Sequence, residues 1–506
     1  MASHIPPEVV HLLNNPEGRF VLVKGKAGTG KTMFCLELVR ECGGLYISTR
    51  VRPDRLYADC PGLEESVPPD FIIDAATDLD ETVLKDFMAK PPVQPNGLPP
   101  PPNGLPPPPG KQAATPKKSA AGFMAELAMP PLFRKILDKI EVAQIPFVVV
   151  IDSWDAVFSY SDAPKTDLRR GWNREELRAL LFNAFRNRNV NLVLVEEGGH
   201  NGEMDYLVDG VIEMRRERWN GRILRVMHLM KTRGTEAVRP EYLFTLHGGR
   251  FQYFEPFVPK IPARPKIWKP MTDTEARYSS GSEDLDILLG GGFRKGTTVL
   301  VELGDSVPDE ALEQLVTQVS ANFLAQNRAI LMVPPGGMDV ESIAQRGIRD
   351  VGDDVFNANV RLIEKGGGPV PRDRPYIVSL KFESPRQDFN DWLYIYKSLR
   401  QRTGQPVLEI VGIDTQEARY GEESYKELLS VSSELTRKEG NLTIRITRPG
   451  MEGLTRRCAN VSDVHLKMVE LSGAVLVYLE KPRSGLFYMD TDASGGNIRI
   501  TLSPLV

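Results

Sequence analysis

The sequence predicts an α/β protein of two tandem domains, each a mainly parallel sheet flanked by helices. Three observations lead to this prediction. Apolar runs of strand length alternate with helix-like stretches, motifs of the first half recur in the same order in the second, and a proline-rich segment separates the halves. A chain of 506 residues is also long for a single domain. We expect a first domain at 1–255, a linker at 256–272 and a second domain at 273–506.

The first domain is expected to alternate strands with helices. Its strand-like runs are RFVLVKG (19–25), GLYISTRV (44–51), FIIDAA (71–76), FVVVID (147–152), NLVLVEE (191–197) and VIEMRR (211–216). Helix-like stretches such as KTMFCLELVREC and REELRALLFNAFRNR lie between them. This alternation favours a parallel sheet covered by helices.

Two proline-rich segments interrupt the pattern. The stretch at 90–121 contains NGLPPPP twice in succession and cannot form a packed core, so we expect polyproline II structure or disorder. It is either a docking site for a proline-binding partner or a solvent-exposed insertion. The linker at 256–272 has a proline at every third residue from 256 to 265, which suits an extended strut.

The second half repeats three motifs of the first. GTTVLVELGDSVPDE, which begins at Gly296, aligns without a gap on GRFVLVKGKAGTGKT, which begins at Gly18. Further along, IDTQEA (413–418) matches IDSWDA (151–156), and EKPRSG near the end matches MKTRG. Three matches in the same order indicate a duplicated domain.

The stretch GKAGTGKT has the full G-x-x-x-x-G-K-[ST] phosphate-binding pattern, between a predicted strand and a predicted helix. Its glycines let backbone N–H groups and the helix N-terminus face an anion. We expect Lys31 to reach the β- and γ-phosphate oxygens and the Thr32 hydroxyl to ligate Mg²⁺. The alternative is a glycine-rich turn that contains a lysine by chance. The predicted nucleotide-binding residues of the loop are Gly25, Lys26, Ala27, Gly28, Thr29, Gly30, Lys31 and Thr32.

Asp152 ends the most apolar strand of the first domain, FVVVID. A carboxylate there can hold the magnesium shell opposite the phosphate loop. Many buried strands end in aspartate, so this assignment depends on the presence of the loop. The sequence therefore predicts ATP and Mg²⁺ as cofactors, with Thr32 and Asp152 at the metal.

The turn that aligns with this loop in the second half has lost its lysine and its hydroxyl. The loop residues Gly25, Gly28, Gly30, Lys31 and Thr32 correspond to Leu303, Ser306, Pro308, Asp309 and Glu310. Pro308 removes one backbone donor, and two carboxylates repel a triphosphate. We predict that the second domain binds no nucleotide and that Asp414, the counterpart of Asp152, is structural.

These motifs carry a family resemblance. SSGSEDLDILLGGGFRKGTTVLVE (279–302) resembles the start of the RecA-like KaiC domain, and GKAGTGKT, LYISTRVRP and VVVIDSWDAV are similar to archaeal KaiC-type P-loop ATPases. They resemble in particular the GvpD family of gas-vesicle regulatory proteins. The resemblance covers most of 15–250 and 279–485. It implies two RecA/KaiC-like domains and a nucleotide-dependent regulator whose partner is a transcriptional activator.

One departure from the KaiC pattern concerns the catalytic base. KaiC-like ATPases place paired glutamates after the second strand, where this sequence has Thr49, Arg50 and Val51. An arginine cannot act as a base, so we expect any ATPase activity to be slow. Arg50 either binds the γ-phosphate or is a surface residue at a strand end. Glu196 or Glu197 either replaces the base or is a polar strand terminus.

A second departure concerns MKTRGTEA. KaiC relatives carry Lys-x-Arg-Gly, usually with a later histidine, which reaches the nucleotide of a neighbouring subunit. This sequence keeps Lys231 and Arg233 but has Ala237 in place of the histidine. The two cations either neutralise γ-phosphate charge in a homo-oligomer or form a solvated basic loop. The candidate catalytic residues are thus Asp152, Glu197, Lys231 and Arg233.

An arginine-rich stretch, MRRERWNGRILR (214–225), surrounds Trp219. Asn220-Gly221 predicts a hairpin turn, so we expect the arginines to decorate a β-ribbon. They bind a phosphate backbone or an acidic protein face, or they form a solvated hairpin. The arginines concerned are Arg215, Arg216, Arg218, Arg222 and Arg225.

Composition limits the remaining choices. The formal net charge is −4, so no overall basic field points to nucleic acid, and nothing predicts sequence-specific base readout. The four cysteines lack metal-ligand spacing, and we expect a cytoplasmic protein without a membrane segment. The predicted function is an ATP-binding regulator with a protein partner. The alternatives are an active ring ATPase that acts on DNA and an autokinase.

Overall fold

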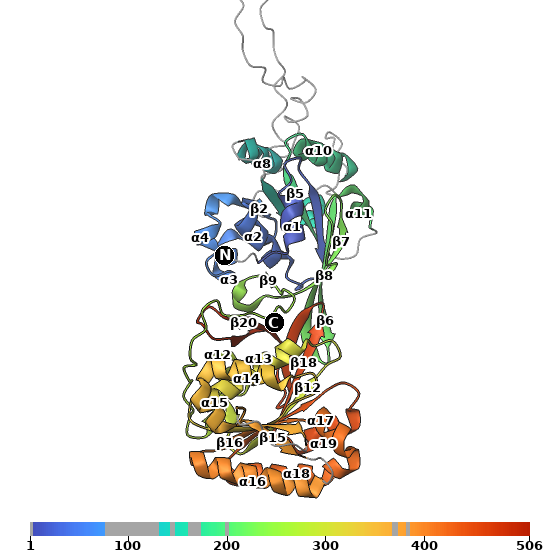
Figure 1. The fold of residues 1–506 in the computed structure, drawn as a ribbon. Coiled ribbons are helices and arrows are strands. Elements are labelled where there is room, and N and C mark those ends of the chain that lie inside the picture. Colours follow the sequence, from blue (N-terminus) through green and yellow to red (C-terminus); the bar gives the residue numbers. More distant parts are fainter. Residues whose placement is uncertain are drawn as a thin grey trace, which may run out of the picture. The chain divides into compact units, whose positions relative to one another are not determined.

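The computed structural model describes residues 4–75, 131–141, 147–159, 174–197, 202–366, 373–380 and 385–506. The proline-rich stretch at 90–121 lies outside these residues. The chain divides into two compact units. Unit 1 comprises Met1–Arg216, Val226–Tyr242 and Gly248–Tyr253, and unit 2 comprises Glu217–Arg225, Leu243–His247 and Phe254–Val506. Figure 1 shows the helices and strands of both units.

The sheet of unit 1 has the strand order β3-β2-β4-β5-β1-β6-β7-β8-β9, and the pairs from β3 to β6 are parallel. The strands are β1 (Phe20–Gly25), β2 (Gly44–Ser48), β3 (Ile72–Asp74), β4 (Val148–Asp152), β5 (Asn191–Glu197), β6 (Gly210–Trp219), β7 (Arg222–Thr232), β8 (Glu241–Thr245) and β9 (Gln252–Tyr253). The first six match the apolar runs of the sequence, so the predicted α/β class is confirmed. Because β2, β4, β5 and β1 are adjacent and parallel, their carboxyl ends meet at one edge of the sheet.

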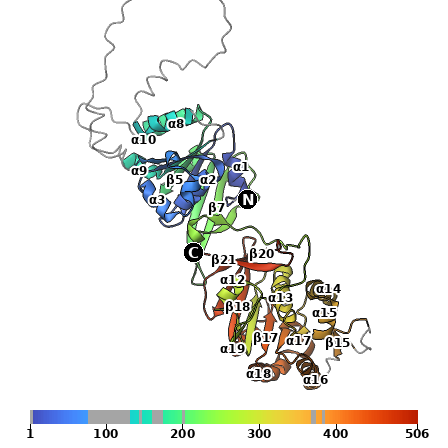
Figure 2. The same cartoon turned by 90° about the vertical axis from the view of Figure 1, so that its left-hand side faces the viewer.

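Helices cover both faces of this sheet (Figures 1 and 2). The helices are α1 (Pro7–Leu13), α2 (Lys31–Cys42), α3 (Pro53–Asp59), α4 (Leu63–Ser66), α8 (Pro131–Glu141), α9 (Trp154–Ser159), α10 (Arg174–Arg186) and α11 (Glu203–Leu207). Phe20 and Leu22 of β1 share a buried apolar cluster with Phe133 of α8 and Phe185 of α10. Side chains alternate along a strand, so Val21 and Val23, also buried, point to the opposite face, which α2 covers.

The sheet of unit 2 repeats this topology. Its order is β15-β14-β13-β16-β17-β12-β18-β19-β20-β21, with parallel pairs from β15 to β18 and antiparallel pairs beyond. Apart from the edge strand β15, the order is that of unit 1. The strands are β12 (Thr297–Leu303), β13 (Ala329–Val333), β14 (Val360–Lys365), β15 (Ile377–Leu380), β16 (Val407–Gly412), β17 (Leu442–Thr447), β18 (Val464–Leu471), β19 (Ala474–Lys481), β20 (Phe487–Asp492) and β21 (Arg499–Pro504). A small ribbon of β10 (Arg277–Tyr278) and β11 (Phe293–Arg294) precedes them.

Helices also cover both faces of the second sheet (Figure 1). They are α12 (Glu283–Leu288), α13 (Asp309–Leu324), α14 (Val340–Val351), α15 (Asp353–Asn359), α16 (Pro385–Thr403), α17 (Ile413–Tyr420), α18 (Glu422–Glu439) and α19 (Glu452–Val461). Leu312 of α13 and Phe356 of α15 share a cluster with Val299 of β12, whereas Leu454 of α19 joins Leu300 on the opposite face. No helix in the described part of the chain is long and apolar enough to cross a membrane.

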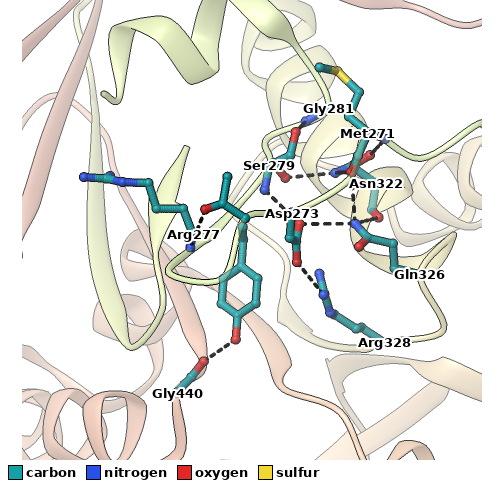
Figure 3. Close-up of polar contacts among 11 residues, drawn as sticks. Met271, Asp273, Arg277, Ser279, Gly281, Asn322, Gln326, Arg328 and Gly440 are labelled. Carbon is teal, nitrogen blue, oxygen red and sulfur yellow. Dashed lines mark hydrogen bonds and ion pairs between the residues drawn. The ribbon is translucent and has the colours of Figure 1, made fainter. Parts of the chain in front are cut away.

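The segment before α12 is fixed to α13 by polar contacts (Figure 3). The Asn322 amide oxygen accepts the Trp268 indole N–H at 3.2 Å and the Met271 backbone N–H at 2.8 Å, and its NH₂ group donates to the Ser279 carbonyl at 2.9 Å. Asp273 forms an ion pair with Arg328 at 2.5 Å, and both side chains are largely buried. The end of the segment expected to be a linker therefore belongs to the packed body of unit 2.

Unit 2 also buries a glutamate and an arginine on the face that carries α18. Glu409 of β16 is 1% exposed, and its carboxylate accepts only a long bond, 3.4 Å, from the Thr443 hydroxyl among the described residues. Arg445 of β17 is equally buried and donates to the Leu429 carbonyl and the Ser433 hydroxyl. Burial raises the pKa of Glu409 to about 8, although Arg445 opposes the shift.

Candidate functional site

The phosphate loop of unit 1 runs from the end of β1 to the start of α2, as the sequence predicts. A Cβ atom at Gly25 would lie 2.3 Å from the Met214 carbonyl oxygen, so no other residue fits there. Gly30 precedes the helix with a φ of 104°, a conformation that glycine adopts at little cost. The loop therefore has the backbone that lets N–H groups at the helix N-terminus face an anion.

Lys31 points back into this loop. Its ammonium group donates to the carbonyl oxygens of Gly25 at 2.6 Å and Lys26 at 3.0 Å, and the side chain is 6% exposed. Burial lowers the pKa of Lys31, while the nearby Glu197 and Asp152 carboxylates oppose the shift. Phosphate oxygens are acceptors of the same kind as these carbonyl groups, so the residues present fit a nucleotide phosphate.

Asp152 faces the loop from the end of β4. Its Oδ2 atom accepts the Thr32 hydroxyl at 2.7 Å and the Tyr46 hydroxyl at 2.5 Å. The pairing of the helix threonine with the strand-end carboxylate is the arrangement that holds Mg²⁺ beside a nucleotide in P-loop proteins. Burial, together with Asp152, raises the pKa of Tyr46 well above its ordinary value, so the hydroxyl stays protonated as a donor.

Arg50 and Glu197 form an ion pair at the same edge of the sheet. Arg50 follows β2, and Glu197 ends β5 directly beside Gly25 in the strand register. Asp155 of α9 accepts the backbone N–H of Glu197 at 2.7 Å. The structure thus brings Arg50, Glu197 and Asp152 together around Lys31.

Lys231 and Arg233 find partners elsewhere. Lys231, near the end of β7, donates to the carbonyl oxygens of Asp205 and Val208, both at 2.7 Å. Arg233 lies 3.7 Å from Asp209, and its side chain is 61% exposed. Within this chain Lys231 fixes β7 to α11 and to the residue that follows it, and Arg233 remains accessible to another molecule.

The arginine-rich hairpin forms as predicted, since Asn220 and Gly221 both have positive φ angles, as the turn requires. The expectation that all five arginines decorate its surface is wrong for Arg222 and Arg225, which are 5% and 8% exposed. Arg222 donates to the carbonyl groups of Leu479 and Ser484 and lies over the Tyr478 ring. These two arginines belong to the packing of unit 2 because their planar donor groups satisfy carbonyls there. We call the other three the exposed hairpin arginines (Arg215, Arg216 and Arg218).

The corresponding edge of unit 2 has reversed charges. Arg448, just after β17, lies 2.7 Å from Asp309 and 3.2 Å from Asp414. Glu302 pairs with Thr447, so the next position puts Arg448 where Glu197 stands in unit 1. The lysine of the loop has become an acid and the facing acid has become an arginine. Asp414 also accepts the Gly336 backbone N–H at 2.8 Å, which fits the structural role expected for it.

Sequence reasoning missed Tyr46, Asp155 and Arg448. Tyr46 lies in an apolar strand run, where an aromatic side chain usually serves the core. The aspartates of IDSWDA were noted as part of a motif, but only the sheet order shows that Asp155 holds Glu197 in place. Arg448 had no signal of its own, because its partners are distant in the sequence.

The sequence of this chain is similar to GvpD family models and to individual GvpD proteins. Two protein-family models match the chain. The family model described as GvpD basic region 2 matches residues 267–506, and the family model described as the P-loop domain of the GvpD gas vesicle protein matches residues 125–230. The second match begins beyond the loop itself. Over 100% of its length the chain is 26% identical to Protein GvpD2 of Halobacterium salinarum, of which it covers 97%. It is 24% identical to Protein GvpD1 of the same organism, over 99% of the chain and 96% of that protein.

A similarity over a smaller part of the chain concerns the KaiC proteins. The chain is 28% identical to the circadian clock oscillator protein KaiC of Rippkaea orientalis, over 56% of the chain and 48% of that protein. The tandem sheets, with their matching strand order, agree with a RecA/KaiC-like fold. The two GvpD models together match more than half of the chain.

Proposed function

Because the chain belongs to the GvpD family, we propose that it is an ATP-binding regulatory protein of gas vesicles. In this proposal one ATP with Mg²⁺ binds at Gly25–Thr32, and its presence controls the action of the chain on a protein partner such as a transcriptional activator. The observation that carries the proposal is the contrast between the two loop edges. Unit 1 keeps Lys31, Thr32 and Asp152 together, whereas Asp309 of unit 2 faces Arg448.

Each residue of unit 1 has a part in this proposal. The loop N–H groups and Lys31 bind the phosphates, while Thr32 and Asp152 hold the magnesium ion. Bound ATP with Mg²⁺ supplies a phosphoanhydride that water can cleave. Of the two candidate bases in β5, Glu197 pairs with Gly25 in the strand register, and Asp155 accepts its backbone N–H, whereas Glu196 pairs with Lys24. Because Arg50 and Val51 stand where KaiC-like ATPases have paired glutamates, and an arginine cannot act as a base, we expect turnover below about 1 s⁻¹, under the usual range of enzymes.

Binding stoichiometry tests the proposal directly. We expect equilibrium dialysis of the full chain with labelled ATP and Mg²⁺ to give about one ATP per chain. Lys31→Ala should abolish binding because it removes the phosphate cation. Asp309→Asn, at the aligned position of unit 2, is the matched control and should leave the stoichiometry at one. Two ATP per chain, or unchanged binding by Lys31→Ala, contradicts the proposal.

A further inference from the structure

The ion pair between Arg50 and Glu197 spans the strand end that carries Asp152. In the sheet order β4 lies between β2 and β5, so the two side chains meet across the end of β4. The backbone around them is anchored. The Thr49 hydroxyl donates to the Asp152 carbonyl at 2.9 Å, and the Glu197 N–H donates to Asp155. The pair therefore lies over the magnesium-binding carboxylate and beside Gly25.

The side chains of the pair can change partners. Arg50 and Glu197 are 46% and 37% exposed, and an ion pair in contact with water contributes little net stability. A guanidinium group binds phosphate oxygens through two parallel N–H donors, and a terminal phosphate carries more negative charge than a carboxylate. A γ-phosphate near Lys31 is thus a stronger partner for Arg50 than Glu197 is, and it also repels Glu197.

The charges around the loop point to the same exchange. Lys31 and Arg50 supply two positive charges, Asp152 and Glu197 supply two negative ones, and the Asp155 carboxylate lies next to the backbone of Glu197. A diphosphate contacts the loop and Lys31 but has no γ-phosphate group to offer Arg50. Only a triphosphate adds negative charge on the side where the ion pair lies.

We propose that Arg50 is a γ-phosphate switch, which pairs with Glu197 in the empty and diphosphate states and transfers to the γ-phosphate when a nucleoside triphosphate binds. This inference rests on the proposed function, since it needs nucleotide at Gly25–Thr32. The transfer frees the Glu197 carboxylate and moves Arg50, three residues before the start of α3. The switch makes the chain distinguish ATP from ADP, which a regulator needs if nucleotide state is its signal.

The test measures nucleotide affinities rather than turnover. The dissociation constants of a non-hydrolysable ATP analogue and of ADP, each with Mg²⁺, are measured for the wild type, Arg50→Ala, Glu197→Gln and the double variant. Arg52→Ala, an exposed arginine two residues further on, is the matched control. We expect Arg50→Ala to weaken the ATP analogue about tenfold, the size of one lost charge-assisted contact, with ADP unchanged. Arg52→Ala should change neither affinity.

The double variant separates partner exchange from simple charge removal. Glu197→Gln should tighten binding of the ATP analogue a few-fold, both by releasing Arg50 and by removing the repulsion between Glu197 and the γ-phosphate. This gain should be smaller when Arg50 is already alanine, because only the repulsion is then relieved. If the gain is equal in both backgrounds, Glu197 only repels phosphate and the switch is refuted. Retention of the ATP preference by Arg50→Ala refutes it as well. If the wild type binds neither nucleotide, or binds them independently of Lys31, the proposed function fails and the switch fails with it. Melting curves confirm that each variant is folded.

Discussion

Replacing Glu409 by glutamine should remove a large pH dependence from the stability of unit 2. Glu409 is 1% exposed, and one of its carboxylate oxygens has no hydrogen-bond partner among the described residues. Burial raises its pKa to about 8, so the folded chain prefers the neutral acid. In the unfolded chain the same group titrates near 4.5.

The sign and size of the effect follow from these two pKa values. Between pH 4.5 and 8 the folded state holds a proton that the unfolded state has lost, so the contribution of Glu409 to stability is fully present below pH 4.5 and is lost as the pH rises towards 8. One proton of difference corresponds to about 1.4 kcal/mol per pH unit. The total loss across the window is a few kcal/mol, and the attraction of Arg445 for the ionised carboxylate is already contained in the pKa of about 8.

The assay is urea unfolding of wild type and Glu409→Gln at several pH values from 5 to 9. The difference between the unfolding free energies of the two proteins cancels the titration of all other groups. The unfolding transition whose midpoint changes on substitution is the transition of unit 2. We expect the stability of the wild type relative to the variant to fall steadily with pH. Glu434→Gln, an exposed acid on α18, is the control and should give a flat difference. A flat or rising difference for Glu409→Gln shows an ionised Glu409 in the folded state and refutes the reasoning.

Three further changes test other parts of the structure. Tyr46→Phe removes one donor to Asp152 and should weaken Mg²⁺-dependent ATP binding about tenfold while ATP binding without the metal stays unchanged, as titrations with and without Mg²⁺ can check. Arg448→Met breaks the ion pairs with Asp309 and Asp414 and should lower the unfolding free energy of unit 2 by about 1–2 kcal/mol, as urea unfolding can measure. An unchanged unfolding free energy would show that these ion pairs do not stabilise unit 2. Alanine at all three exposed hairpin arginines should leave ATP binding and the melting temperature unchanged but should reduce the salt-sensitive recovery of partners in pull-downs. Full recovery of the partners would show that these arginines are only solvated surface residues.

The fold and the loop were predictable because their signals are local. Apolar runs fix the strands, and the glycine spacing at Gly25–Thr32 fixes a backbone that few other sequences adopt. Asp152 was predictable because a strand end next to a phosphate loop has a known partner in the helix threonine. The gapless alignment of the two halves of the sequence likewise predicted that the second unit has the same strand order as the first, apart from the edge strand β15.

The rest depends on contacts between residues far apart in the sequence. Tyr46 lies 106 positions from Asp152, and Arg50 lies 147 positions from Glu197. The burial of Arg222 depends on carbonyl groups more than 250 positions away. Residue type alone suggests that Tyr46 lies in the core, that Arg50 lies on the surface and that Arg222 is an exposed charge of the hairpin. Only the order of the strands shows what each of these side chains contacts.

The reversed charges of unit 2 constrain how this chain can evolve. Restoring a lysine at position 309 would put two cations where the structure has a pair 2.7 Å apart, and restoring an acid at position 448 first would crowd three carboxylates around the same turn. Pro308 would still withhold a backbone donor from any phosphate. Each single change towards the residues of the unit 1 loop is therefore unfavourable on its own. Unit 2 cannot acquire the lysine and the facing acid of unit 1 in single steps without passing through an arrangement in which like charges repel each other.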